Sequence, residues 1–123
     1  MATQIKMPSN VAAYMRFLQL AAEISFVSGS FALDANDGAL LDALALHWFE
    51  GEPLAVREAM ALNTLGSPST LNRRISRLKA VGLIEQQSSP KSLRIKLLVP
   101  AKKAMTFFDK LGGAVIKAAK VDR

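Results

Sequence analysis

The sequence has 123 residues, of which 50% are hydrophobic and 21% are charged. This length and balance are typical of one folded domain and exclude an intrinsically disordered chain. The sequence contains no cysteine, which excludes a disulfide framework, a thiol redox sensor and a cysteine-ligated zinc site.

The sequence has one histidine, His47, and no glycine-rich phosphate loop. A histidine-based metal site or a Ser-His relay therefore cannot form within one subunit. We expect no enzyme activity, no catalytic residue, no bound metal and no cofactor. No apolar run approaches the roughly 18 residues of a membrane span, and residues 1–10 lack the apolar core of a signal sequence. We therefore expect a soluble, cytoplasmic protein with no membrane partner.

Charge is divided sharply along the chain. Residues 1–66 hold three basic and seven acidic residues, a net of −4, whereas residues 67–123 hold thirteen basic and three acidic residues, a net of +10. A basic half-chain can bind a polyanion such as nucleic acid, although a solvated Lys/Arg face can also simply maintain solubility.

Hydrophobic spacing, capping residues and turn residues predict a mainly α-helical chain with one small β-hairpin. The expected helices are 10–27, 34–49, 54–62, 68–81 and 101–120, and the expected strands are 83–87 and 93–99. Pro53 should open the third helix as its first residue. Asp34, Asp37 and Asp42 should stabilise the start of the second helix by capping and by complementing its dipole.

The first and last helices each carry an apolar face. In the first helix the face comprises Val11, Tyr14, Leu18, Ala21 and Ala22. In the last helix it comprises Met105, Phe108, Leu111, Val115 and Ala119.

The helix from Pro68 to Val81 has the composition of a helix that enters the DNA major groove. Ser67 is a good N-cap and Pro68 a good first residue, and Gly82 marks the end. The apolar stripe consists of Leu71, Ile75 and Leu78. The opposite face consists of Ser69, Thr70, Arg73, Ser76, Arg77 and Ala80, with Asn72 and Arg74 on the flanks where they could reach phosphates. Small polar residues permit groove entry, and arginine can donate two hydrogen bonds to guanine.

A basic hairpin follows this helix directly. Period-two alternation predicts that Leu93, Ile95 and Leu97 face inward while Arg94 and Lys96 face outward. We expect Lys91 and Arg94 to share in nucleic-acid binding.

These residues resemble the MarR-type winged helix-turn-helix regulators. The run Ser69–Leu78 (STLNRRISRL) followed by Val81–Glu85 (VGLIE) is similar to that family's recognition helix and its exit into the wing, and the resemblance covers roughly residues 10–120. It implies a winged helix with a helix-turn-helix at about 54–81, a wing at about 83–99, and dimerisation helices at about 10–28 and 101–120, within a single domain 1–123.

The resemblance also implies roles for individual residues. Ser69, Thr70 and Arg73 would face bases, and Asn72, Arg74 and Arg77 would contact phosphates or brace the wing. The wing departs from the family pattern: Lys91–Arg94 (KSLR) stands where the family has Asp-x-Arg, and either Lys91 or Arg94 takes the place of the minor-groove arginine. The expected DNA-binding set is Ser67, Ser69, Thr70, Asn72, Arg73, Arg74, Ser76, Arg77, Lys91 and Arg94.

The resemblance further implies a homodimer that binds double-stranded DNA as a transcriptional regulator, most simply a repressor, with an unidentified small-molecule effector possible. The aromatic and aliphatic residues near the two ends exceed what a small core needs and indicate an interface. They are Phe17, Leu18, Phe26, Phe31, Phe107, Phe108, Val115 and Ile116. Two alternatives remain: a winged-helix protein-interaction module, and a sequence-tolerant DNA-binding protein of a mobile element or replication system.

Overall fold

The computed structural model describes residues 5–27 and 33–120, without the side chains of 25–27. The chain divides into two compact units. One unit comprises Met1–Ser30 and Thr106–Arg123, and the other comprises Phe31–Met105. No helix within the described ranges is long and apolar enough to cross a membrane.

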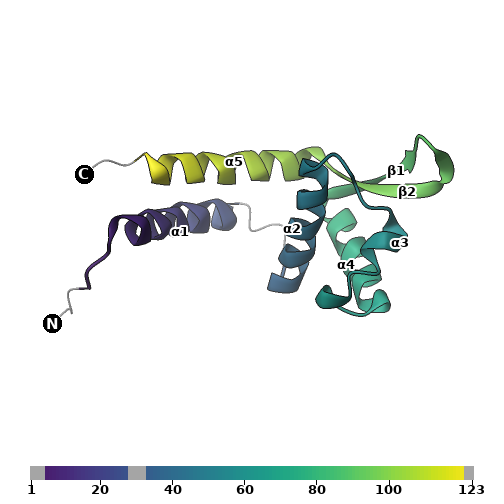
Figure 1. The fold of residues 1–123 in the computed structure, drawn as a ribbon, viewed down its shortest axis with the longest axis horizontal. Helices are drawn as coiled ribbons and strands as arrows, with labels where there is room; N and C mark the ends of the chain where they lie inside the picture. The colour runs from purple at the N-terminus through teal and green to yellow at the C-terminus, as the bar shows by residue number, and fades with distance from the viewer. Residues whose placement is uncertain (1–4, 28–32, 121–123) are drawn as a thin grey trace. The chain divides into compact units, whose positions relative to one another are not determined.

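The second unit contains a helix-turn-helix followed by a hairpin (Figure 1). Its elements are α2 (Ala35–Phe49), α3 (Val56–Ala59), a 3₁₀ turn (Asn63–Leu65), α4 (Pro68–Ala80), β1 (Ile84–Ser89) and β2 (Ser92–Pro100). The strands pair antiparallel, and Ala55 adds an isolated antiparallel bridge to Leu97. This is the predicted winged-helix fold class, mainly helical with a small β-hairpin.

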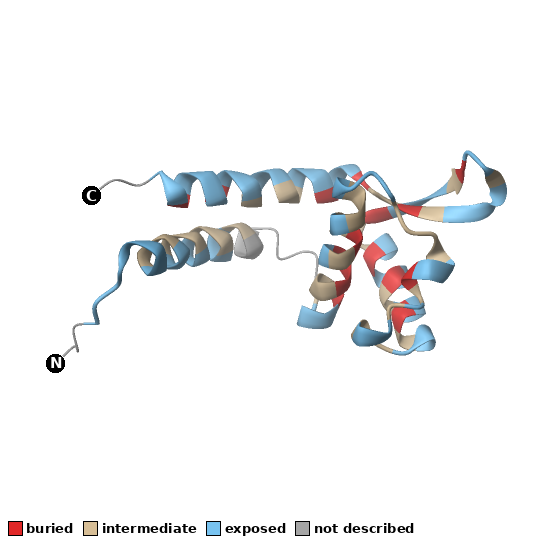
Figure 2. Ribbon diagram, in the orientation of Figure 1, coloured by how far each residue is buried: buried red, intermediate tan, exposed pale blue. Residues whose placement is uncertain are grey.

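The core of this unit lies between α2, α4 and the base of the hairpin. Figure 2 shows buried residues on the facing sides of α2 and α4, whereas the outer part of the hairpin is mostly exposed. The largest fully buried apolar side chains are Leu40, Leu44, Leu71, Ile75, Leu78, Leu83, Ile84 and Leu98. The predicted stripe of α4 is therefore confirmed, because its three apolar residues are all in the core.

The hairpin differs from its prediction at its outer end. Leu93 is 79% exposed and Ile95 is 43% exposed, so the expectation that they face inward is wrong. The register shifts between Ser88 and Ser89, which pair with Lys96 and Ser92, and so residues 93–95 fall outside the regular pairing. This part of the hairpin projects beyond the helices of its unit (Figure 1).

The third helix is shorter than predicted. Pro53 does not open it, because Ala55 is its N-cap and its residues are only Val56–Ala59. The carbonyl of Leu54 instead accepts a hydrogen bond from the Leu98 amide at 2.8 Å. Pairing with β2 therefore holds this segment extended.

The first unit contains α1 (Ser9–Val27) and most of α5 (Lys102–Ala119), which lie side by side in Figure 1. The predicted apolar faces of both helices are largely exposed. In α1 the exposed residues include Val11, Tyr14 and Leu18, and the half-buried ones are Ala12, Ala13, Arg16, Phe17, Leu20, Ala21 and Ile24. In α5, Val115 is exposed while Ala114 and Ala118 are buried. Both helices thus have one apolar stripe packed within the unit and a second one facing solvent.

A polar contact joins these two helices. Nε and Nη2 of Arg16 donate to the carbonyl oxygen of Ala118 at 3.2 and 3.1 Å. An arginine at the last turn of α5 complements the partial negative charge of that helix end.

Candidate nucleic-acid interface

The start and end of α4 are specified as the sequence predicts. Ser67 is the N-cap, and its Oγ accepts a hydrogen bond from the Thr70 amide at 3.3 Å, with Pro68 in the first turn. Gly66 before it has φ of 146°, and Gly82 after it has φ of 83°, a region that L side chains rarely adopt. The two glycines therefore delimit the helix.

The outward face of α4 is polar and free of acid. Ser69, Arg73 and Ser76 are exposed, as is Asn72 on the flank, and Thr70 is half-buried. This face holds no bulky apolar side chain. It is compatible with insertion into a major groove about 12 Å wide.

Three hydroxyl groups gather at the N-terminus of α4. The Ser67 hydroxyl donates to Thr70 Oγ1 at 3.0 Å, and the Ser67 and Ser69 hydroxyls lie 3.5 Å apart. A helix N-terminus carries partial positive charge, so a phosphate near this end of α4 would be stabilised.

Arg74 differs from its prediction. Only 13% of its side chain is exposed, and its Nη1 lies 2.9 Å from Asp37 Oδ1 and 3.1 Å from Asp34 Oδ1. Its Nε is buried without a hydrogen-bond partner among the described residues. The expectation that Arg74 projects from the flank toward phosphates is therefore wrong, because two carboxylates at the start of α2 hold its guanidinium inside the protein.

The two carboxylates also cap α2. Asp34 is the N-cap and accepts from the Asp37 amide at 2.8 Å, while the Asp34 amide donates to Asp37 Oδ2 at 3.2 Å. The capping role predicted for these two residues is confirmed. The amide of Asp37 holds the pKa of Asp34 below its usual value, and Arg74 and Arg77 add to this effect while desolvation opposes it. The hydrogen bond to Asp37 is also the main cause that raises the pKa of Arg74.

Among the residues that the structure describes, Arg77 is held at one nitrogen only. Its Nη1 donates to Asp37 Oδ2 at 2.9 Å and lies 3.6 Å from Asp34 Oδ2, but 42% of its side chain remains exposed. Arg77 thus lies between the internal ion pairs and the solvent-facing side of α4.

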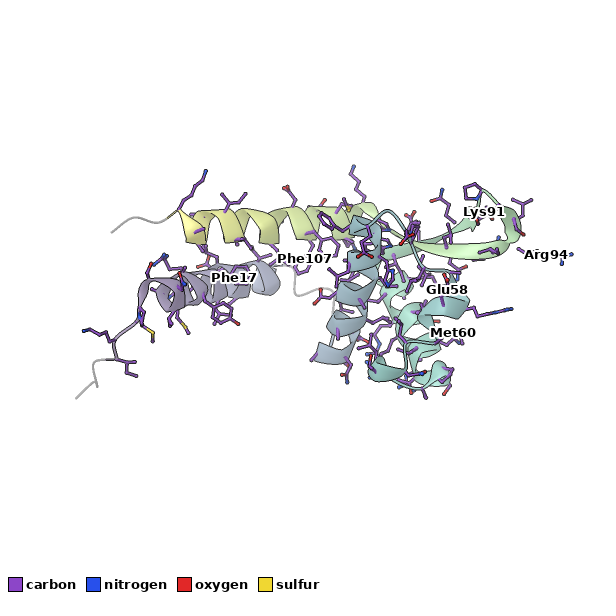
Figure 3. All side chains as sticks on the ribbon, viewed as in Figure 1. Phe17, Glu58, Met60, Lys91, Arg94 and Phe107 are labelled. Atoms are coloured by element: carbon purple, nitrogen blue, oxygen red, sulfur yellow. The ribbon has the colours of Figure 1, made fainter. Side chains whose placement is uncertain are left out.

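The wing places its predicted basic residues in solvent. Lys91 and Arg94 are exposed, and Figure 3 places both at the outer end of the hairpin, where Arg94 extends away from the ribbon. Their backbone amides donate to Ser89 Oγ at 3.1 Å and Ser92 Oγ at 3.2 Å, which shapes the turn. The Lys96 side chain instead lies against the neighbouring strand β1, where its Nζ donates to Ser88 Oγ at 2.9 Å.

Sequence reasoning missed the link from α2 to α4. A signal for it exists: Asp34 and Asp37 are three residues apart, as are Arg74 and Arg77, so each pair lies on one helix face with complementary charge. The pairing itself joins residues about forty positions apart. Helical spacing alone does not reveal which faces meet.

No protein-family model and no curated protein matches the sequence. Several solved structures are similar in fold. The transcriptional regulator Tm0710 from Thermotoga maritima is 23% identical, with 81% of this chain and 67% of that chain covered and a TM-score of 0.58.

Two further structures extend this comparison. The S. aureus MepR–DNA complex is 14% identical, with 87% and 82% of the two chains covered and a TM-score of 0.62. AbsC, a MarR family transcriptional regulator from Streptomyces coelicolor, is 19% identical, with 96% and 80% covered and a TM-score of 0.53. The element order, the hairpin after α4 and these matches together give the chain the winged-helix fold of the MarR-type regulators.

Proposed function

We propose that the protein is a sequence-specific, double-stranded DNA-binding transcriptional regulator, most simply a repressor that occludes a promoter. The observation that carries this proposal is the acid-free outer face of α4, where Ser69, Arg73 and Ser76 are exposed beside a helix N-terminus suited to phosphate. The MepR structure, which has this fold, is a complex with DNA.

We assign the DNA contacts by where each side chain lies. Ser69, Thr70, Arg73 and Ser76 would face base edges in the major groove. Ser67, Asn72 and Arg77 would contact phosphates, and Lys91 and Arg94 would contact the flanking minor groove or its phosphates. Arg74 is left out of this set because its guanidinium already has two carboxylate partners.

A homodimer is part of the proposal. The exposed apolar residues of the first unit are Ile5, Met7, Val11, Tyr14, Met15, Leu18, Val115 and Ile116. Ile5 and Met7 precede α1, whereas the others form a second apolar stripe on α1 and on α5. A second copy of the chain would cover such stripes. Of the interface residues expected from the sequence, Phe17, Phe107 and Phe108 are half-buried, whereas the Phe26 side chain and Phe31 lie outside the described residues. Figure 3 labels Phe17 on α1 and Phe107 on α5.

The test is selection of preferred sequences from random duplexes, followed by a footprint. A two-fold symmetric motif with half-sites about 10 base pairs apart is expected, because a dimer presents two recognition helices one DNA turn apart. Uniform weak binding, with Kd around 10⁻⁴ to 10⁻⁶ M, would instead favour the sequence-tolerant alternative. No DNA binding at low salt would favour the protein-interaction module.

A further inference from the structure

Four charged side chains, those of Asp34, Asp37, Arg74 and Arg77, form a cluster between the start of α2 and one flank of α4. Asp37 is fully buried, and its carboxylate accepts hydrogen bonds from Arg74, Arg77 and the Asp34 amide, at 2.9, 2.9 and 3.2 Å. The cluster has two negative and two positive charges. The two arginines differ in burial: Arg74 is almost enclosed, whereas the side chain of Arg77 remains 42% exposed.

We propose that Asp34 and Asp37 are positioning residues for DNA binding, which hold Arg77 by its Nη1 and orient its remaining donors toward a DNA phosphate. This inference rests on the proposed function and deepens it. Arg74 is the internal partner that keeps the two carboxylates in place. The acidic pair therefore supports the binding of an anion, although its own charge is negative.

The chemistry of the guanidinium group supports this assignment. It carries five N–H donors in a rigid planar fork, and only Nη1 of Arg77 is bound to the carboxylates. Nε and Nη2 have no partner among the described residues, and together they present two donors to a phosphate. A side chain held at one nitrogen has already lost part of the conformational freedom that binding would otherwise remove. Arg77 follows Arg73 by four residues, so both lie on neighbouring positions of the same helix side.

Simple electrostatics and the positioning role predict opposite changes in DNA affinity when an acidic residue is removed. The direction of the change therefore tests the proposal. Removing an acidic charge near a DNA-binding surface should raise affinity for every duplex, because the field becomes more positive. Loss of positioning should instead lower affinity for the preferred site. The decisive variant therefore removes one negative charge and keeps the local fold.

Asp34→Asn is that variant, because asparagine caps a helix as well as aspartate does. Its matched control is Asp42→Asn, which removes the same charge from α2 at a position that makes none of the ion pairs among the described residues. Affinity is measured on the selected duplex and on an unrelated duplex of equal length, across a salt series, with circular dichroism to establish folding.

For Asp34→Asn we expect affinity for the selected duplex to fall by at least about threefold, as is typical of coupled neighbours. The slope of log K against log salt should lose up to about 0.9, the value of one phosphate contact. Asp42→Asn should leave affinity unchanged or raise it. In an Arg77→Ala background, Asp34→Asn should have little further effect, because the residue that it positions is gone.

Equal or tighter binding by Asp34→Asn, matching Asp42→Asn, would overturn the positioning role. If Asp34→Asn does not fold, Arg77→Lys provides the second measurement. Lysine keeps the charge but lacks the fork that can reach a carboxylate and a phosphate together. It should therefore lose affinity for the selected duplex, and binding equal to wild type would reject the proposal. Failure of the wild-type protein to bind any duplex would instead reject the proposed function itself.

Discussion

The indole Nε1 of Trp48 donates a 2.8 Å hydrogen bond to the carbonyl oxygen of Leu98 and thereby joins α2 to β2. The carbonyl belongs to a fully buried residue, and the Leu98 amide is bound to the Leu54 carbonyl. The base of the wing is therefore tied to α2 on one side and to the segment before α3 on another.

Trp48→Phe should destabilise the protein by about 1 to 3 kcal/mol, because it leaves the Leu98 carbonyl without its donor. Urea denaturation followed by circular dichroism measures this change. Phe49→Ala is the control, since Phe49 is 91% exposed and its loss should change the free energy of unfolding by less than about 0.5 kcal/mol. Equal effects of the two substitutions would contradict the role of the Trp48 bond.

Leu98→Ala and Leu93→Ala test the observed orientation of β2. Leu98 is fully buried, so its truncation should cost about 2 to 5 kcal/mol. Leu93 is mostly exposed, so the same substitution should change stability by less than about 0.5 kcal/mol. Thermal or urea unfolding distinguishes the two. A large loss of stability in Leu93→Ala would contradict the exposed position of Leu93 and support the inward orientation expected from alternation.

Arg73→Ala and Lys91→Ala test the division between base and phosphate contacts. Arg73→Ala should weaken binding to the preferred site by roughly 1 to 3 kcal/mol and relax base preference, because Arg73 is exposed on the face of α4 proposed to contact bases. Lys91→Ala should weaken binding about equally on all sequences. Fluorescence anisotropy on matched and mismatched duplexes measures both effects. The DNA-binding proposal fails if neither substitution changes affinity at low salt.

Stability should depend on pH through Asp34. Its pKa is lowered in the folded protein from the usual 3.8, so its ionised form stabilises the fold above that value, and this contribution is lost as pH falls through the lower folded pKa. The Tm of wild type should therefore exceed that of Asp34→Asn at neutral pH, and the gap should close in acid.

Asp42→Asn should behave in the opposite way in the same pH series. Burial raises the pKa of Asp42, so its charge opposes folding at neutral pH and its removal should leave Tm unchanged or raise it.

For Asp34→Asn, the contrary outcome is a Tm difference from wild type that persists unchanged at low pH. That result would show that the interaction lost in this variant is not ionic.

Ile116→Asp should disrupt the proposed homodimer. Ile116 is exposed on α5 beside Val115, and a charge in an apolar interface is costly to bury. Sedimentation equilibrium should show a dimer for wild type and a shift toward monomer for the variant. Leu46→Asp is the control, because Leu46 is an exposed residue of α2 in the other unit. A wild-type protein that is monomeric at tens of micromolar would reject the dimer proposal.

Local sequence signals were sufficient to predict α4 and the order of the elements around it. The N-cap at Ser67, the proline after it and the apolar stripe of Leu71, Ile75 and Leu78 are all present as predicted. These features depend on hydrogen bonds and spacings within one helix. The sequence therefore determined where the helix lies and which of its faces is buried.

Tertiary structure decided which charges remain available to a ligand. Arg73 and Arg74 are adjacent in the sequence, but only Arg73 is left in solvent, because Asp34 and Asp37 on another helix bind Arg74. Leu93 likewise belongs to a regular alternation that predicts a buried side chain, but the fold leaves it mostly exposed. In both cases the outcome depends on what the fold brings from a distant part of the chain, and periodicity along one element carries no information about that partner.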